Sequence, residues 1–286
     1  MRSLLAVAET GTITAAAQRL GLTQPALSRR IQQLEEDLDT KLLVRGRKGA
    51  TLTDSGALAE QEARVLVARY EGLRTRISNL QGLDTGTVRL GGGATAIEFL
   101  VPPAIAQFQR QHPGIRFQVK EAGSREIEQD VINGTLELGL VTQPVLHGPE
   151  LHTQSLFSDR IVLVAHVSHP LASRDSVAVE ELASLTLVGF EGGSAIRKIV
   201  DDALRRMAVQ MNVVMELRSI PAILRMVATT GSLAFVSRLG TELQPDIREI
   251  PVSDLAVERE LALVSRRGTE LSAAARAFAN KLLAAS

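Results

Sequence analysis

Residues 14–38 read TAAAQRLGLTQPALSRRIQQLEEDL, and this stretch decides the fold of the amino-terminal part of the chain. Its spacing predicts two short helices joined at Gly21, because glycine supplies the open backbone conformation that the turn of a helix-turn-helix requires. The small side chain of Ala17 lets the two helices approach closely. Thr23 is expected to cap the second helix, and Pro25 falls in its first turn, where a missing N–H costs little.

The second of these helices is expected to have one apolar and one polar face. The apolar positions recur at helical spacing and should face the core: Leu27, Ile31, Leu34 and Leu38. The outer face is predicted to contact DNA through Gln24, Pro25, Ser28, Arg29 and Arg30. Arginine can hold guanine at two points, glutamine can do the same with adenine, and serine suits base or phosphate. An ordinary surface hairpin of helices would fit this stretch equally well, since short motifs of this kind have false positives.

A basic hairpin over residues 42–53 favours the DNA-binding interpretation. Glycines flank its tip, which carries Arg47 and Lys48, and Arg45 lies on the first arm. A basic tip beside a recognition helix suits contact with phosphates or with the minor groove.

At this point the sequence resembles the LysR-type transcriptional regulators. The resemblance is carried by the run ETGTITAAAQRLGLTQPALSRRIQQLEEDL at 9–38, by LLVR at 42–45 and by LTDSG at 52–56. Many members have phenylalanine where this chain has Leu43. The resemblance implies a winged helix-turn-helix DNA-binding domain over residues 1–53 and a linker helix over 54–82. It also implies a homodimer, often paired into a homotetramer, that binds promoter DNA and contacts RNA polymerase.

The segment 53–80 has no proline and repeats apolar positions every seven residues. The positions alternate by four and three, as in a coiled-coil seam, and predict dimerisation through Ala59, Ala63, Leu66, Tyr70, Leu73, Ile77 and Leu80. A lone amphipathic helix packed on its own domain is the alternative. If the seam forms, the two DNA-binding domains of the dimer would bind the two half-sites of an inverted repeat.

Strands and helices alternate along the remainder of the chain, which predicts an α/β class with mostly parallel sheets. The resemblance continues through HPLASRDSVAVEELASLTLVGF at 169–190 and a last helix at 269–285. It implies a two-lobed α/β effector-binding domain over 87–286, similar to periplasmic binding proteins. Lobe I would take about 87–158 and 265–286, and lobe II about 159–264. Strands near 156–160 and 261–265 would cross between the lobes.

Two predicted helix starts suggest a site for a small molecule. A helix N-terminus offers free N–H groups and the positive end of a dipole, both suited to an anion. Thr95 would stand at such an end in lobe I and Ser194 at one in lobe II, and these are the strongest candidates. By resemblance the effector-binding residues are Thr95, Ala96, Gly123, Ser124, Thr142, Phe190, Ser194, Ile220 and Pro221. Helix capping or loop packing is an equal alternative for any single member. The expected ligand is an anionic effector of unknown identity, and no cofactor is implied.

A competing interpretation rests on residues 91–96, GGGATA, which satisfy the dinucleotide-binding pattern G-x-G-x-x-A. Glu121 would end the next strand, where a ribose-binding acid is expected, so an NAD-dependent dehydrogenase is the alternative function. No set of residues for hydride transfer accompanies the loop, and a lone glycine pattern is weak evidence. We therefore expect no enzyme and no catalytic residues.

Composition limits the remaining classes of function. The 286 residues include no cysteine, which excludes a thiolate zinc site and a disulfide framework and suits a cytoplasmic protein. No secretory signal and no membrane-length apolar run is present, so no membrane partner is expected. The formal net charge is zero, so DNA attraction must come from local cations. His166 and His169 lack a third ligand nearby, and the acidic run 35–39 is expected to be a solvated helix end.

Overall fold

The predicted helix-turn-helix forms within α2 (Ile13–Arg19) and α3 (Gln24–Asp37) and packs with α1 (Arg2–Thr10). Gly21 adopts a φ of 63°, the left-handed conformation that its place in the turn requires. The Thr23 hydroxyl accepts a hydrogen bond from the Ala26 N–H at 3.4 Å and so caps α3. The sequence-based prediction of this motif is therefore confirmed.

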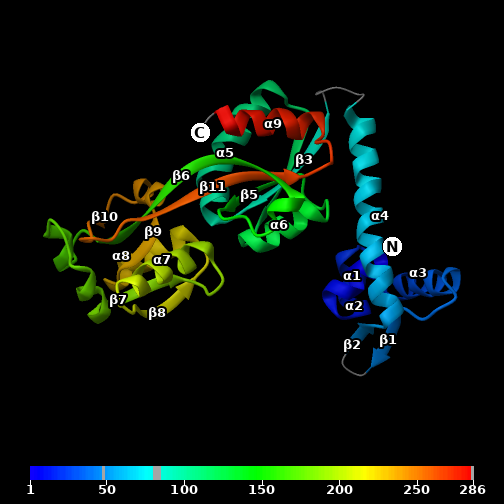
Figure 1. Cartoon of the computed structure of the whole chain (residues 1–286), viewed down its shortest axis with the longest axis horizontal. Helices are drawn as coiled ribbons and strands as arrows, with labels where there is room; N and C mark the ends of the chain where they lie inside the picture. Colours follow the sequence, from blue (N-terminus) through cyan, green and yellow to red (C-terminus); the bar gives the residue numbers. More distant parts are fainter. Residues whose placement is uncertain (47–48, 80–84, 285–286) are drawn as a thin grey trace. The chain divides into compact units, whose positions relative to one another are not determined.

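The computed structural model describes residues 1–46, 49–79 and 85–284, and the chain divides into unit 1, Met1–Ile77, and unit 2, Ser78–Ser286 (Figure 1). The core of unit 1 contains Leu27 and Ile31, both fully buried, with Leu34 partly buried against it. Leu38 was expected in this core, but it is 45% exposed. The reason is that α3 ends at Asp37, so Leu38 is the C-cap residue and has left the helical stripe.

The basic hairpin consists of β1 (Leu43–Gly46) and β2 (Gly49–Leu52), which pair antiparallel. Its tip residues, Arg47 and Lys48, lie outside the described residues. The hairpin is tied to the helices because the Ala50 N–H donates to the Gly11 carbonyl at 2.9 Å. The wing is therefore held by backbone hydrogen bonding as well as by side chains.

Helix α4 (Asp54–Asn79) follows the wing and carries the predicted dimerisation positions. Ala63 is fully buried within the single chain, and Ala59 is partly buried against the core of unit 1. The side chains from the next two heptads are 46–56% exposed, and they are Leu66, Tyr70, Leu73 and Ile77. Leu80 lies outside the described residues. The first heptad positions therefore pack on the core of unit 1, as expected for a lone helix packed on its own domain. The later positions are exposed.

Unit 2 contains a seven-stranded sheet with the order β10-β6-β11-β5-β3-β4, in which β9 also pairs with β6, and a two-stranded sheet of β7 and β8. The strands are β3 (Gly86–Gly92), β4 (Ile115–Glu121), β5 (Leu138–Thr142), β6 (Leu151–His166), β7 (Thr186–Phe190), β8 (Asn212–Leu217), β9 (Ala234–Ser237), β10 (Ile247–Ile250) and β11 (Val257–Arg266). The expectation of mostly parallel sheets is wrong. Within the described residues, the parallel strand pairs are β3 with β4, β3 with β5 and β7 with β8, besides two isolated parallel bridges, whereas β6 and β11 pair antiparallel with all their partners. These two strands connect the lobes, and an α/β alternation read along the sequence does not reveal their direction.

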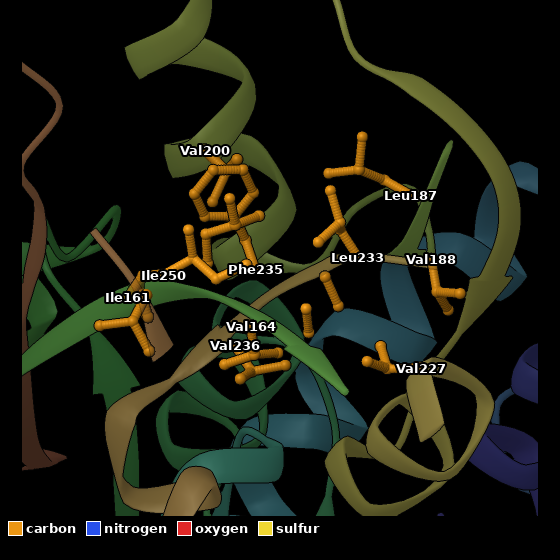
Figure 2. Close-up of a cluster of buried hydrophobic side chains, with 14 of the residues drawn as sticks. Ile161, Val164, Leu187, Val188, Val200, Val227, Leu233, Phe235, Val236 and Ile250 are labelled. Atoms are coloured by element: carbon orange, nitrogen blue, oxygen red, sulfur yellow. The ribbon is translucent and has the colours of Figure 1, made fainter. Parts of the chain in front are cut away.

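Among the described residues, separate hydrophobic clusters define the lobes, two in lobe I and one in lobe II. In lobe I, α5 (Val101–Gln111), α6 (Ser124–Ile132) and α9 (Ala273–Ala284) cover the β3-β4-β5 end of the large sheet. In lobe II, α7 (Ala195–Arg206) and α8 (Ile220–Thr230) pack on β7, β9 and the far end of β6. Figure 1 shows β6 and β11 running side by side from one lobe to the other. Figure 2 shows the aliphatic packing of the lobe II core, with Val164 and Val236 from adjacent strands beside Val227 of α8.

Two helix starts in unit 2 have identifiable local causes. Helix α5 is preceded by a π-helical turn, η1 (Ala96–Leu100), where the Val101 N–H donates to the Ala96 carbonyl. Pro102 and Pro103 follow and supply no N–H groups, so the preceding carbonyls lack their usual α-helical donors. The last helix begins at Ala273 and not at 269, because the Ser272 hydroxyl accepts from the Ala275 N–H at 3.1 Å and marks the N-cap.

Every helix among the described residues is too short or too polar to span a lipid bilayer. No group of three or more potential metal-ligating side chains occurs in the same residues. His169 instead accepts a hydrogen bond from the Leu171 N–H at 3.1 Å, which stabilises the turn that follows β6.

Candidate DNA-binding surface and effector pocket

The polar face of α3 lies open to solvent along its first two turns. Gln24, Pro25, Arg29 and Arg30 are exposed, and Ser28 is half-buried. The opposite face is anchored by the buried side chains of the core, so these polar groups project from a fixed helix. Arg45 belongs to β1, whereas Arg47 and Lys48 lie outside the described residues.

Glu35 corrects the expectation that residues 35–39 form a solvated helix end. Its side chain is only 6% exposed. One carboxylate oxygen accepts from the backbone N–H groups of Leu42 and Leu43, at 2.9 and 3.2 Å, and the other pairs with Lys41 Nζ at 2.8 Å. Burial acts to raise the pKa of Glu35, but these hydrogen bonds outweigh it and hold the pKa below its ordinary value. Glu35 thus fixes the start of the wing against the recognition helix.

Unit 2 contains a pocket of about 640 Å³ between the two lobes. Its wall is built from the loop after β3, the start of α6, the end of β5 and the loop between β7 and α7. The lobes approach closely there, because a Cβ on Gly123 of lobe I would lie 3.9 Å from the Gly193 carbonyl oxygen of lobe II. The pocket therefore offers one ligand contacts from both lobes.

Six of the nine predicted effector-binding residues lie in this wall, namely Thr95, Gly123, Ser124, Thr142, Phe190 and Ser194. The other three lie outside it. Ala96 packs into the lobe I core, Ile220 is fully buried in the lobe II core, and Pro221 is exposed on the first turn of α8. The prediction placed α8 at the cleft, but its N-terminus instead faces Glu98.

The buried charges at the pocket are Arg259 on β11 and Asp159 on β6, neither of which was predicted from the sequence. Arg259 Nη2 lies 2.7 Å from an Asp159 oxygen, and the two side chains are 5% and 1% exposed. Burial lowers the pKa of Arg259, and the adjacent Asp159 acts in the opposite direction. A sequence signal did exist, because each is a charged residue inside or beside an apolar crossing strand, where only a paired charge is tolerated.

The rim of the pocket also carries charges, most of them paired. Arg218 pairs with Glu191 at 2.6 Å, and Lys120 pairs with Glu126 at 2.7 Å. Arg125 adds a further cation to the lining. The rim therefore presents no large excess of negative charge to an entering anion.

Glu98, on the π-helical turn of lobe I, forms a contact between the lobes. Its carboxylate lies near the backbone of Ile220 and the side chain of Ser219, at the N-terminus of α8 in lobe II, and its buried Oε2 has no hydrogen-bond partner among the described residues. Burial, and then the negative charge of Glu121, raise the pKa of Glu98, while the Ile220 backbone and the Ser219 side chain act to lower it. Phe99, the next residue, packs against the lobe II core. The turn at 96–100 is thus a point where lobe I contacts lobe II.

Comparison with known families agrees with this architecture. Residues 1–57 match the model described as "Bacterial regulatory helix-turn-helix protein, lysR family", and residues 81–286 match "LysR substrate binding domain". The chain belongs to the LysR family of transcriptional regulators. As a LysR-type regulator it binds DNA and a small-molecule effector and is not an enzyme, so the dehydrogenase interpretation of residues 91–96 is wrong.

Relatives of this LysR-type regulator support the same assignment. It is 30% identical over 294 residues to the "Probable RuBisCO transcriptional regulator" of Nostoc sp. (strain PCC 7120 / SAG 25.82 / UTEX 2576), covering 99% of this chain and 86% of the relative. Full-length CbnR complexed with its target DNA shares the fold, with a TM-score of 0.68, 20% identity and coverage of 100% and 98% of the two chains. The Synechocystis PCC6803 CcmR regulatory domain in complex with 2-PG gives a TM-score of 0.65 at 23% identity, covering 70% of this chain and 97% of that domain.

Proposed function

We propose that this LysR-type regulator reads promoter DNA with the outer face of α3 and that a small anionic effector in the pocket between the lobes changes that binding. The observation that carries the proposal is the pairing of two features in one chain. An exposed polar face on a firmly packed recognition helix precedes an effector domain whose pocket is lined by two helix N-termini and a buried arginine. Binding that favours one arrangement of the lobes would shift the population of the whole regulator.

In this proposal Gln24, Ser28 and Arg29 read bases, while Pro25 and Arg30 flank them. Arg45, Arg47 and Lys48 of the wing hold the DNA backbone. Phosphate contacts of that kind make affinity depend strongly on salt, and base contacts supply the specificity. The CbnR structure, which has the same fold, was determined with its target DNA, which supports DNA binding by a chain of this fold.

Replacement of Arg29 by alanine should weaken specific DNA binding by about 1–3 kcal/mol, because a bidentate contact to guanine would be lost. Fluorescence anisotropy with a duplex selected from random DNA by the wild-type protein measures this change. Arg205→Ala is the matched control, since Arg205 is an exposed arginine on α7 of unit 2. Wild-type affinity in the Arg29→Ala variant would exclude base reading by this side chain.

The same titration, repeated with 2-PG present, tests the effector half of the proposal. The CcmR domain with this fold was determined in complex with 2-PG, so this compound is the first probe. We expect the affinity of the wild-type protein for DNA to change while Arg29→Ala keeps its thermal response to the compound. If no small carboxylate or phosphate shifts either DNA binding or thermal stability, the pocket is not an effector site.

We further propose that the exposed part of α4 pairs two copies of the chain, so that two recognition helices meet two half-sites. Four of the exposed apolar side chains on this helix, Leu66, Tyr70, Leu73 and Ile77, would form the seam with Leu80. Ala59 and Ala63 would support it from the head. Contact with RNA polymerase and a further pairing into a tetramer belong to the same proposal.

Introducing aspartate at both Leu66 and Leu73 should convert the dimer into monomers, because four charges would face each other across the seam. Multi-angle light scattering reads the molecular mass directly. Gln61→Asp places a charge on the opposite side of the same helix and should leave the mass unchanged. A dimer that survives both aspartates would show that another surface joins the subunits.

A further inference from the structure

The hydroxyl groups of Thr95, Thr142 and Ser124 form what we call the floor of the pocket. Each of them already accepts a hydrogen bond. Arg259 Nη2 donates to Thr95 Oγ1 at 2.6 Å, and Arg259 Nη1 donates to Thr142 Oγ1 at 3.4 Å. The Thr142 backbone N–H donates to Ser124 Oγ at 3.0 Å. These hydroxyls come from the loop after β3, the end of β5 and the start of α6.

From this arrangement, and resting on the proposed effector role of the pocket, we propose that Arg259 fixes the hydroxyls of Thr95 and Thr142 as hydrogen-bond donors, so that the floor favours a ligand group that offers acceptor oxygens and negative charge, a carboxylate or a phosphate. Arg259 is on this account a positioning residue for specificity, which acts through the two threonines.

The direction of each hydrogen bond follows from the chemistry of the donor. A guanidinium has five N–H donors and no acceptor, so a threonine oxygen beside it can only accept. A hydroxyl has one proton, and that proton then remains to be donated elsewhere. Within the described part of the chain, no protein acceptor is recorded for the protons of Thr95, Thr142 or Ser124. Each hydroxyl therefore keeps its proton for donation to an occupant of the pocket, together with one lone pair.

The guanidinium cannot easily turn away from the threonines, because its other side is held. Its Nε and Nη2 lie 2.8 and 2.7 Å from one Asp159 oxygen, and the second Asp159 oxygen accepts from Ser237 Oγ at 2.7 Å. Asp159 and Ser237 are both fully buried, with 1% and 0% exposure. Releasing Arg259 would leave a buried carboxylate unpaired, which is strongly unfavourable. The donor role of these hydroxyls therefore depends on residues of β6 and β11, the strands that join the lobes.

A ligand group that must donate is matched less well, because each threonine hydroxyl can offer it only one lone pair, beside the Arg259 cation. Sites built from fixed polar groups reject the wrong partner strongly, because the buried groups would be left unpaired. A carboxylate and a primary amide have nearly the same shape but differ in charge and in that the amide carries N–H donors. They form a matched pair of probes for the polarity of the floor.

The test compares malonate with malonamide on the full chain, with affinities measured by calorimetry and the site located by backbone NMR shifts at residues 93–95 and 123–124. The wild-type protein should bind malonate more tightly than malonamide by about tenfold or more. Thr95→Ser, which keeps the hydroxyl, should retain this preference, and Thr95→Val should lose most of it. Arg259→Lys should pair with Asp159 yet reduce the preference, because one ammonium cannot reproduce the planar fork that reaches both threonines.

The ratio of the two affinities is the deciding quantity, since a variant that only loosens the fold weakens both probes together. Arg225→Lys, an exposed position on α8 outside the pocket, is the matched control for the charge-preserving change. If Arg259→Lys fails to fold, the Thr95→Ser and Thr95→Val pair still decides the question.

Equal binding of malonate and malonamide by the wild-type protein would overturn the proposal, as would an unchanged preference in Thr95→Val. So would the absence of shifts at these residues with malonate, inorganic phosphate and 2-PG alike. Failure of the effector function would have a different signature, in which malonate binds with the expected preference but DNA affinity does not respond to any acid.

Discussion

Replacing Gly56 with alanine should cost unit 1 about 3 kcal/mol or more of its free energy of unfolding, at the upper end of what overpacking does. Gly56 is buried near the start of α4. A Cβ added there would overlap sterically with the Leu42 carbonyl oxygen. The Leu42 carbonyl carbon would lie at 3.0 Å and Leu52 Cδ2 at 3.2 Å. The Leu42 oxygen cannot retreat easily, because it accepts the Thr53 N–H at 3.0 Å.

Gly72 provides the matched control for this substitution, since it lies in the same helix and a Cβ there would have nothing within 4 Å. Gly72→Ala should stabilise by about 0.4–1 kcal/mol, because alanine restricts the unfolded chain and suits a helix. Urea unfolding of the full-length protein, followed by circular dichroism, separates the two variants. If Gly56→Ala unfolds at the wild-type urea concentration, α4 does not pack against the wing as described.

Replacing Glu35 with alanine should destabilise unit 1 by about 2–5 kcal/mol, because the buried N–H groups of Leu42 and Leu43 would each lose their acceptor. Specific DNA binding should fall with it, since the wing would no longer be fixed to the end of α3. Glu36→Ala is the control on the same helix, where the exposed side chain should contribute within about 0.5 kcal/mol. A stability equal to wild type in Glu35→Ala would show that the wing is held by other contacts.

The pH dependence of stability gives an independent reading of the same residue. The pKa of Glu35 lies below its ordinary value of 4.5, so the folded state favours the charged form. Its stabilisation is therefore present above pH 4.5 and is lost as the pH falls through the folded-state pKa. Glu35→Gln should lose stability at neutral pH and show a flatter decline below pH 4.5 than the wild-type protein. An unchanged acid profile would contradict the assignment of the lowered pKa to Glu35.

The burial of Glu35, in contrast to the exposure of its acidic neighbours, could not be predicted from the sequence. Residues 35–39 look alike as an acidic run, and only the return of the chain at 42–43 buries one carboxylate and leaves the next exposed. Leu38 is the reverse case, because its spacing fits the apolar stripe but the helix ends one residue earlier. Both errors arise because an acidic or apolar residue was assigned from its local pattern, while burial depended on a segment elsewhere in the chain.

The pocket shows the same division. Thr95 and Ser194 were predicted because glycine-rich loops before helices are recognisable in one dimension, and the structure brings both into one wall. Ile220 and Pro221 are also at the start of a helix, yet Glu98 of the π-helical turn in lobe I faces that N-terminus. Which helix starts face the pocket depends on how the lobes meet, and a linear pattern does not contain that information.

The helix-turn-helix, the wing, the family and the two-lobed α/β class could be predicted from the sequence, because each depends on short-range spacing, turn chemistry or a run of motif residues. The antiparallel crossing of β6 and β11 and the burial of Arg259 beside Asp159, Thr95 and Thr142 became apparent in the folded chain alone. Arg259 and Asp159 are 100 residues apart along the chain. They meet because two strands pair in one register, and that register is set by the packing of whole lobes.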